Sequence, residues 1–596
     1  MCGIAGYTGF RDAVPVVIDS LKRLEYRGYD SAGVAVLGQG VKLYKDKGQI
    51  AQLEPLLAHI SGSIAIGHTR WATHGKPSKE NAHPFIDCQG EIALAHNGII
   101  ENYFTLREQL KAEGHKFTSE TDSEVVVHLV EKFYRGNLEA AVREALKLIE
   151  GTYAFVIIHS REPDKIIGAR NFSPMVIGVG SGDNMLASDI PAILKLTDKV
   201  IYLRDREMAV LTPSHVRILD FDGKEVSREP QTISWSIDDA ERGGFEHFML
   251  KEIFEQPEAI HQTLLGRLGE TELDGILGKG IGSVKLVACG TSYHAALAGK
   301  YILEELARVP ATAELASEYR YSQGGTDRPL VILLSQSGET ADTLAAAREA
   351  KRRGCLTLAI SNYVGSSMSR EADVTFYTRA GLEIGVAATK TFLTQLVALY
   401  LIGIKMGLAR NALTHTEADN LLDELRNLPR VVQSVLDQVE SVERVIGRFD
   451  KVESAFFLGR YVNYPIALEG ALKMKEISYI HAEGYPGGEL KHGPLAVISP
   501  QTPVVAVAIK DHTYEKMLSN IREVNARGSP IIGVGLRTDS DLAKFVDDVI
   551  QVPPVRPLLS TVPVTVVLQL LAYYVARSRG CSIDKPRNLA KTVTVE

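Results

Sequence analysis

The C-terminal two thirds of this 596-residue chain alternate apolar runs with helical patterns, and this alternation restricts the possible fold more than any other feature. The run "VKLVACG" leads into a helical pattern from about Tyr293, "PLVILLSQSG" leads into "ETADTLAAAREAKRRG", and "LTLAISN" follows. Apolar strands that each precede a helix indicate a parallel sheet covered on both faces. We therefore expect a doubly wound α/β domain in this part of the chain.

A second copy of the same pattern follows the first. "SAFFLGRYVNYPIALEGALKMKE" repeats the strand, glycine and helix of "VKLVACGTSYHAALAGKYILEE", while "TPVVAVAIK" and "PIIGVGL" correspond to "PLVILLSQ" and "LTLAISN". Few residues are identical, so the repeat depends on pattern and spacing. Between the copies, residues of about 413–448 carry apolar side chains at helical spacing and are predicted to form helices.

The first 235 or so residues have a different pattern. Short alternating runs such as "SIAIGHTR", "EIALAHNG" and "YAFVIIH" are mixed with a few helical patterns, which is typical of an α+β domain. The pattern changes around Gly243 and Gly244, where two glycines interrupt the chain. The sequence predicts an α+β domain over 1–238, a linker over 239–247, and α/β domains over 248–430 and 431–596.

Composition excludes several classes of partner. The 66 basic and 73 acidic residues give a net charge of −7, without a basic tract that would bind nucleic acid or an anionic membrane.

The five cysteines are far apart and lack the paired spacing of disulfides or zinc sites. The apolar stretches 396–404 and 562–576 are shorter than the roughly 20 residues of a membrane span, so we expect buried helices. No signal peptide is indicated. We expect a cytoplasmic protein that binds small molecules or its own copies.

Cys2 stands directly behind the initiator methionine in "MCGIAGYTGF". Removal of Met1 would leave a thiol and a free α-amine on one residue. A thiol with a pKa near 8.5 needs a base at neutral pH, and an α-amine with a pKa of about 7.7–8.0 can be that base. From this residue alone, however, a strand that happens to begin with cysteine is the simpler interpretation.

Four further residues fit the needs of a glutaminase. Such a site requires a cation for the substrate α-carboxylate, an anion for its α-ammonium, and donors for the tetrahedral oxyanion. Arg70, Asp122, and the Asn97 side chain with the Gly98 backbone N–H can fill these roles. Each also has an ordinary explanation. Arg70 could form a surface ion pair, Asn97 and Gly98 a hairpin turn, and Asp122 the cap of the helix over "SEVVVHLVEKF".

The segments "MCGIAGY", "LEYRGYDSAG", "GHTRWATHG", "HNGIIEN" and "SETDSEV" resemble the class II glutamine amidotransferases. In that family the N-terminal-nucleophile (Ntn) hydrolase domain is a four-layer α+β sandwich. The resemblance implies that the mature chain begins at Cys2, which attacks the glutamine amide and releases ammonia. It also implies that Thr73 and His74 belong to the glutamine pocket, and that Arg27 and Trp71 lie near the passage that guides ammonia out.

Hydroxyl groups concentrate in the turn of "LLSQSGETADT", where a predicted buried strand meets a helix. The N-terminus of a helix favours an anion, and ligands of doubly wound sheets gather at the carboxyl ends of the strands. We therefore expect a phosphate here, although an ordinary Ser/Thr-rich cap is the alternative. The side chains that could hold it are Ser335, Gln336, Ser337 and Thr340, with Thr291 and Ser292 at the end of the preceding strand.

The second copy has "AIKDHTYE" in place of the serine-rich turn, so we do not expect it to hold phosphate in the same way. It offers Glu469, Lys473 and Glu476, which at i, i+4 and i+7 share one face of a predicted helix. A solvated stripe of ion pairs is the alternative. His492 follows in a loop rich in glycine and proline, where a structural histidine would be unremarkable.

These features resemble the sugar isomerase (SIS) domains. From Cys2 to Glu596 the chain is similar to the family of amidotransferases that transfer glutamine nitrogen to fructose 6-phosphate. The resemblance implies that the serine-rich turn, Thr291 and Ser292 hold the sugar phosphate and neighbouring hydroxyls. It further implies that Lys591 forms a Schiff base with the ketose, that His492 assists ring opening, that Glu476 moves a proton between C1 and C2, and that Lys473 supports this exchange.

The same resemblance implies at least a homodimer, with the sugar site formed partly at the subunit interface. Neither a redox cofactor nor a metal is required by the expected chemistry.

Two other functions fit the sequence less well. An amidotransferase that acts on phosphoribosyl pyrophosphate would need an acidic phosphoribosyltransferase motif, which we do not find. A non-catalytic sugar-phosphate sensor would not need Cys2, Arg70, Asp122, Glu476 or Lys591.

Overall fold

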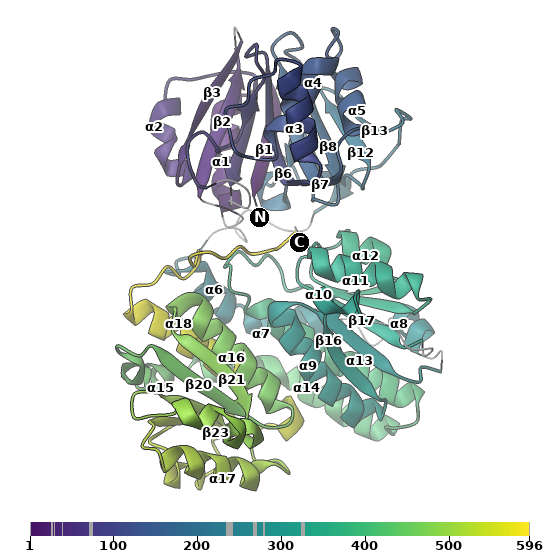
Figure 1. The fold of residues 1–596 in the computed structure, drawn as a ribbon. Helices are drawn as coiled ribbons and strands as arrows, with labels where there is room; N and C mark the ends of the chain where they lie inside the picture. Colours follow the sequence, from purple (N-terminus) through teal and green to yellow (C-terminus); the bar gives the residue numbers. More distant parts are fainter. Residues whose placement is uncertain are drawn as a thin grey trace. The chain divides into compact units, whose positions relative to one another are not determined.

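The structure is a computed structural model, and it describes residues 2–25, 28, 30–38, 40–70, 76–233, 242–265, 271–277, 280–322 and 328–594. The chain divides into two compact units. The first consists of Met1–Glu241 with Ala590–Glu596, and the second of Arg242–Leu589. Figure 1 shows the ribbon of each unit, coloured along the sequence.

The first unit contains two antiparallel sheets. The larger has the strand order β14-β11-β9-β10-β1-β4-β2-β3, and the smaller has the order β13-β12-β8-β7-β6-β5. The strands of the larger sheet are β1 (Gly3–Gly9), β2 (Ser31–Leu37), β3 (Val41–Lys47), β4 (Ile64–Arg70), β9 (Val176–Val179), β10 (Asp183–Ala187), β11 (Lys199–Tyr202) and β14 (Gln231–Thr232). Those of the smaller sheet are β5 (Phe85–Ile86), β6 (Ile92–Ile100), β7 (Gly151–His159), β8 (Ile166–Asn171), β12 (Glu207–Leu211) and β13 (Val216–Asp220).

Alternating side chains on these strands build three apolar layers. Ala5 and Tyr7 of β1 belong to the core beneath helix α1 (Ala13–Leu24), whereas Ile4 belongs to a core shared with Ala93 and Ala95 of β6. The opposite face of β6 packs against α3 (Tyr103–Ala112), α4 (Glu124–Phe133) and α5 (Leu138–Leu146). Figure 1 shows these helices on the outer faces of the two sheets. The predicted four-layer α+β sandwich is therefore confirmed.

The second unit contains two parallel five-stranded sheets. The first has the order β16-β15-β17-β18-β19 and the second β21-β20-β22-β23-β24, so both have the doubly wound order 2-1-3-4-5. The predicted repeat is confirmed. The first α/β module has strands β15 (Val284–Ala288), β16 (Ala311–Leu315), β17 (Leu330–Ser335), β18 (Thr357–Ser361) and β19 (Val374–Tyr377). The second has β20 (Ser454–Gly459), β21 (His481–Pro486), β22 (Val504–Val507), β23 (Ile531–Leu536) and β24 (Asp548–Val552).

Helices cover these sheets and connect them. They include α6 (Phe248–Phe254), α7 (Gln256–Leu264), α8 (Thr271–Leu277), α9 (Gly290–Ala307), α10 (Ala316–Tyr319), α11 (Ala341–Arg352), α12 (Ser367–Glu371), α13 (Lys390–Ala409), α14 (His415–Leu436), α15 (Glu440–Glu443), α16 (Asn463–Ser478), α17 (Tyr514–Asn525) and α18 (Thr561–Ser578). The helices α14 and α15 confirm the helical prediction between the copies. The two α/β modules share one hydrophobic core, in which Leu286 and Ile302 of the first cluster with Phe457 and Met474 of the second.

The two most apolar segments lie in α13 and α18, as buried helices. Segments 390–409 and 557–578 are long and apolar enough to cross a membrane, but 83% and 100% of their most apolar windows are buried inside the protein. Such burial is typical of the core helices of a folded domain. The predicted domain borders at 238, 248 and 430 stay predictions.

Candidate active site

Cys2 directly precedes β1, an interior strand of the larger sheet of the first unit. The antiparallel register of β1 and β4 pairs Gly3 with Thr69, so its continuation sets Cys2 opposite Arg70. Arg70 is only 3% exposed, so the alternative of a surface ion pair is wrong. Burial lowers the pKa of Arg70, while the nearby charges of Cys2 and Asp122 act in the opposite direction. The predicted carboxylate-binding cation is thus close to the predicted nucleophile.

Asn97 contacts Cys2 directly. Its Nδ2 donates to the Cys2 carbonyl oxygen at 2.9 Å, and its Oδ1 lies 3.0 Å from Nε2 of His68. The same Nε2 lies 3.0 Å from the carbonyl oxygen of His96, so it faces two acceptors and must carry the proton. Burial lowers the pKa of His68 to about 3, which keeps the ring neutral at pH 7. His68 therefore holds the Asn97 amide with its NH₂ toward Cys2.

Sequence reasoning missed His68, although the quoted "GHTR" contains it. Residues two apart on a strand point to the same face, and His68 stands two before Arg70 in β4. Its ring stacks on His83 at a centroid distance of 4.1 Å. His83 Nδ1 in turn accepts from the His96 backbone N–H at 3.2 Å. A packed histidine cluster thus supports the Asn97 side chain from behind.

Asn97 and Gly98 lie inside the long strand β6, where they pair with Ala154 and Tyr153 of β7. The alternative of a hairpin turn is therefore wrong. Gly98 has a φ of +122°, and a Cβ there would lie 1.9 Å from the Thr152 carbonyl oxygen. Only glycine fits this position.

Asp122 is buried and accepts from the Ile100 backbone N–H at 2.8 Å. The residue at the cap position of α4 is Ser123, so the interpretation of Asp122 as a helix cap is wrong. Ser123 Oγ instead lies 2.7 Å from Nδ1 of His96. The predicted α-ammonium anchor is thus fixed to the strand that carries Asn97.

The remaining predicted residues of the glutamine site lie outside the described residues. They are Arg27, Trp71, Thr73 and His74, and their roles stay predictions.

In the second unit, the serine-rich turn joins β17 to α11 at the carboxyl end of the strand. Ser335 Oγ lies 3.0 Å from Thr340 Oγ1 and accepts from the Gly338 N–H at 3.1 Å, and Ser337 Oγ accepts from the Glu339 N–H at 3.1 Å. Ser335 is buried, whereas Gln336, Ser337 and Thr340 are partly exposed. Thr291 and Ser292 do not end the preceding strand but lie in the first turn of α9, after β15. The order 2-1-3-4-5 makes β15 and β17 neighbours at the switch point, so the serine-rich turn and the first turn of α9 border the expected ligand crevice.

Glu469, Lys473 and Glu476 share one face of α16, as predicted, but they do not form a solvated stripe. Glu469 and Lys473 are 1% and 0% exposed. Lys473 Nζ lies 2.5 Å from Glu476 Oε2, 3.4 Å from Glu469 Oε1 and 3.1 Å from Thr291 Oγ1. Burial acts to lower the pKa of Lys473, but the charges of Glu469 and Glu476 outweigh burial and raise it above its ordinary value. The lysine is therefore held as a buried cation.

This ion cluster connects the two α/β modules. Thr291 and His294 of α9 contact Glu469 at 3.1 Å and 2.7 Å, the latter through His294 Nδ1. Ser292 Oγ accepts from Gln395 Nε2 of α13 at 3.0 Å. The sequence predicted that Glu469 shares a helix face with Lys473 and Glu476 but gave it no role. It did not indicate His294 or Gln395. Their partners are more than 100 residues away, so no local pattern marks them.

The corresponding turn after β22 has a different chemistry. Lys510 Nζ lies 3.0 Å from Asp539 and 3.4 Å from Asp541, while Thr513 bonds to Asp511. The acidic side chains neutralise the lysine there, which supports the expectation that the second module does not hold phosphate in the same way.

The other two predicted catalytic residues are His492 and Lys591. His492 is exposed at the end of the short 3₁₀ helix Gly487–His492. Lys591 is partly exposed and belongs to the segment Ala590–Glu596, which groups with the first unit. Their catalytic roles stay predictions.

Comparisons with known proteins agree with this division. A glutamine amidotransferase domain model matches residues 68–195, and an SIS domain model matches 281–405 and 449–579. The chain is 51% identical to the glutamine–fructose-6-phosphate aminotransferase (isomerizing) of Methanosarcina acetivorans and 50% identical to that of Aquifex aeolicus, with 100% of each chain covered. A solved C-terminal domain of glucosamine-fructose-6-phosphate aminotransferase from Francisella tularensis covers 58% of this chain and 100% of its own length, with 41% identity and a TM-score of 0.56.

Proposed function

The chain belongs to the family of glutamine–fructose-6-phosphate aminotransferases (isomerizing), and we propose that the residues placed above perform that family's reaction. Its substrates are L-glutamine and D-fructose 6-phosphate, and its products are L-glutamate and D-glucosamine 6-phosphate, which makes it an entry enzyme of amino sugar synthesis. The observation that carries this function is the end-to-end similarity to relatives of that name, which includes both a glutamine amidotransferase domain and two SIS matches.

In the glutamine half, removal of Met1 exposes the α-amine of Cys2, which takes the proton of the thiol. The thiolate attacks the amide carbon of glutamine, ammonia leaves, and water hydrolyses the thioester to glutamate. One N–H of the Asn97 amide donates to Cys2, which leaves the second, together with the Gly98 N–H, for the oxyanion. Arg70 pairs with the α-carboxylate of glutamine, and Asp122 with its α-ammonium.

In the sugar half, the turn Ser335–Thr340 binds the phosphate of fructose 6-phosphate, with Thr291 and Ser292 at its side. Lys591 forms a Schiff base with the ketose after His492 assists ring opening, and ammonia then displaces the lysine at C2. Glu476 removes a proton from C1 and returns it to C2, which converts the imine of the ketose into the amino aldose. Lys473 supports this exchange because its cation lies 2.5 Å from the Glu476 carboxylate.

Ammonia must pass between the two sites without contact with bulk water, where it would be protonated and lost. Thr73, His74, Arg27 and Trp71 keep the roles that the family resemblance implies, in the glutamine pocket and at the ammonia passage. We also place the protein in the cytoplasm as at least a homodimer, with domains at 1–238, 248–430 and 431–596. Light scattering coupled to gel filtration tests the dimer, since a monomer at assay concentration would contradict it.

The test of the whole function is an assay with glutamine and fructose 6-phosphate. We expect glutamate and glucosamine 6-phosphate in equal amounts. Glu476→Gln should lose amino sugar formation but still hydrolyse glutamine, whereas Cys2→Ala should lose both and still bind fructose 6-phosphate with an unchanged Kd. Cys581→Ser is the control thiol variant and should be fully active. Glutamine hydrolysis without amino sugar in the unaltered enzyme, or Met1 retained in active enzyme by mass spectrometry, would contradict the proposal.

A further inference from the structure

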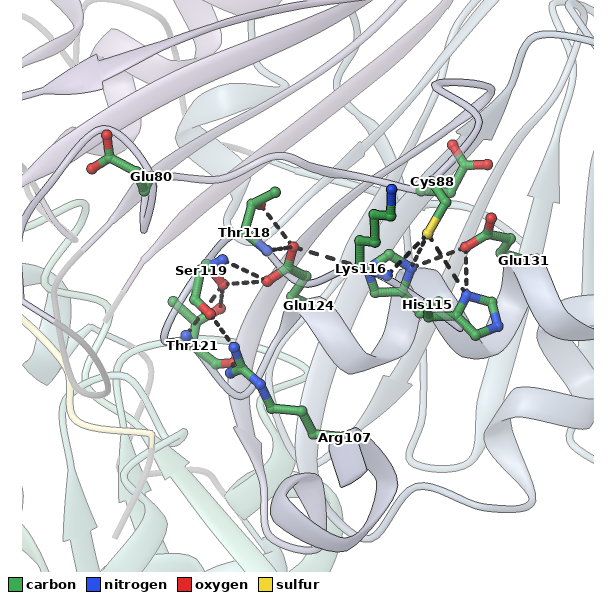
Figure 2. Close-up of polar contacts among 12 residues, drawn as sticks. Glu80, Cys88, Arg107, His115, Lys116, Thr118, Ser119, Thr121, Glu124 and Glu131 are labelled. Atoms are coloured by element: carbon green, nitrogen blue, oxygen red, sulfur yellow. Dashed lines mark hydrogen bonds and ion pairs between the residues drawn. The ribbon is translucent and has the colours of Figure 1, made fainter. Parts of the chain in front are cut away.

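A cluster of metal-ligating side chains lies outside both proposed sites, in the first unit. Among the residues that the structure describes, Cys88, His115, His128 and Glu131 form the one group whose ligand atoms all lie within 4.8 Å of one another. Cys88 follows β5, His115 follows α3, and His128 and Glu131 belong to α4. Figure 2 shows Cys88, His115 and Glu131 next to one another. The cluster therefore brings three separate segments of the chain to one point.

The two distances from Cys88 are close to those of a tetrahedral metal site. Cys88 Sγ lies 3.9 Å from Nδ1 of His115 and 3.7 Å from Nδ1 of His128. Zinc bonds of about 2.3 Å to sulfur and 2.0–2.1 Å to nitrogen, at tetrahedral angles, set sulfur and nitrogen ligands about 3.6 Å apart. Glu131 Oε2 lies 2.8 Å and 2.9 Å from the same two nitrogens, so it would withdraw by about 0.5 Å to reach tetrahedral separation.

A carboxylate also lies beside one of these ligands. Nε2 of His128 is 3.9 Å from Oε1 of Glu124, which is an ion-pair distance and too long for a hydrogen bond. Metal-ligating histidines almost always direct their second ring nitrogen to a carboxylate or a carbonyl. Glu124 is itself fixed, because its two oxygens accept from the backbone and hydroxyl groups of Thr118 and Ser119 at 2.8 Å (Figure 2).

The donor set identifies the ion. One thiolate, two imidazoles and one carboxylate suit Zn²⁺, and four protein ligands without an open position are typical of a structural site. The Lys116 backbone N–H also donates to Cys88 Sγ at 3.3 Å. Cys88 is exposed and His115 partly exposed, so an ion in solution can reach the cluster. The expectation of no metal rests on the cysteine spacing and on the expected chemistry, and a structural site with a single cysteine leaves no trace in either.

We propose that Cys88, His115, His128 and Glu131 bind one Zn²⁺ ion with a structural role. The ion ties the segment after β5 and the segment after α3 to helix α4. On the same helix, Glu124 holds residues 118–119, a few residues before Asp122 at the glutamine site. Binding releases the thiol proton of Cys88, as at other zinc–thiolate sites. The proposal does not depend on the proposed function.

The test uses the full-length chain, stripped with a chelator and titrated with Zn²⁺ or Co²⁺. We expect one ion per chain and, with Co²⁺, a thiolate-to-cobalt charge-transfer band. A hundredfold excess of free Zn²⁺ over Kd should raise the melting temperature of the first unit by roughly 5–10 °C. Both tryptophans, Trp71 and Trp235, belong to the first unit, so their fluorescence reports its unfolding separately.

Two variants and one control complete the test. Cys88→Ser should abolish the charge-transfer band, and both Cys88→Ser and His115→Gln should weaken Zn²⁺ binding more than about 100-fold, since loss of even an outer partner weakens it 10–100-fold. Cys581→Ser, which removes a partly exposed thiol from the second unit, should bind as the unaltered chain does. An unaltered chain that binds no Zn²⁺, a Co²⁺ complex without the band, or variants that bind with unchanged affinity would overturn the proposal. Circular dichroism of the metal-free variants checks that they fold.

Discussion

His68 in the glutamine site and Lys473 in the sugar site are equally buried, at 0% exposure, yet at neutral pH the histidine is neutral and the lysine is a cation. The charged side chain that acts on His68 is the cation Arg70, so burial prevails and the pKa falls to about 3. Lys473 lies between two carboxylates, whose charges outweigh burial. Burial alone therefore does not determine whether a titratable group is charged. The charges of the neighbouring side chains determine it as well.

The largest effect should follow from removing the buried cation. Lys473→Met leaves the buried Glu469 and the partly exposed Glu476 without their counter-charge, and the second unit should lose about 3–5 kcal/mol of stability. Calorimetry of the full chain measures this loss. The triple variant Lys473→Met, Glu469→Gln, Glu476→Gln has no buried charge left and should recover most of it. A loss below about 1 kcal/mol in the single variant would show that the cluster is not desolvated.

The next effect concerns the neutral histidine. His68→Leu removes the donor that orients the Asn97 amide, so glutamine hydrolysis should fall about 10²–10³-fold, as when an oxyanion donor is lost. His68→Gln keeps an N–H donor and should recover part of the rate. The Kd for fructose 6-phosphate, measured by calorimetry, is the control and should not change. If His68→Leu hydrolysed glutamine with an unaltered turnover number, His68 would have no role in the reaction.

Acid should change the free energy of unfolding of the two units differently. The unfolded chain binds a proton at His68 near pH 6.5 and the folded chain only near pH 3, so the unfolded state holds more protons between these values. The free energy of unfolding of the first unit should therefore fall as the pH drops from 6.5, by up to about 1.4 kcal/mol per pH unit for this histidine. Denaturation followed by tryptophan fluorescence at pH 7, 6 and 5 measures it.

Lys473 should contribute nothing to this acid dependence. Its folded pKa lies above the ordinary 10.5, so folded and unfolded chains both hold the proton throughout that range. His68→Leu should accordingly reduce the slope for the first unit, whereas Lys473→Met should not. An equal slope in the unaltered chain and in His68→Leu would contradict the low pKa of His68.

The smallest effect should come from Glu469→Gln. Glu476 still pairs with Lys473, and the glutamine amide oxygen can still accept from Thr291, so the loss should be about 1 kcal/mol. The same calorimetric measurement applies. A loss as large as that of Lys473→Met would mean that Glu469, rather than Glu476, is the principal partner of the cation.

The fold was largely predictable because its signals are local. Apolar runs and helical patterns indicated the parallel sheets, the repeat and a first domain of mixed α+β type, whereas the four-layer sandwich was implied by the family resemblance. The strand order was not predictable, because the side on which β17 pairs with β15 depends on how each helix crosses the sheet.

The site was predictable only where one segment carries it. The i, i+4, i+7 spacing placed Glu469, Lys473 and Glu476 on one face, but their burial depends on α9, some 175 residues earlier. The pair Asn97 and Gly98 gives a local turn signal, which the long pairing of β6 with β7 overrides. In the proposed metal site, Cys88 and His115 are 27 residues apart, so only the helical pair His128 and Glu131 leaves a pattern in the sequence.

Thr291 of the first module lies within hydrogen-bond distance of Glu469 and Lys473 of the second. Two duplicated modules that share such a contact are no longer interchangeable parts. If the second copy were replaced by a version of the first, Lys473 would be lost together with Glu469 and Glu476, and Thr291 and His294 of the remaining module would lose their partners. The junction therefore needs one copy of each kind.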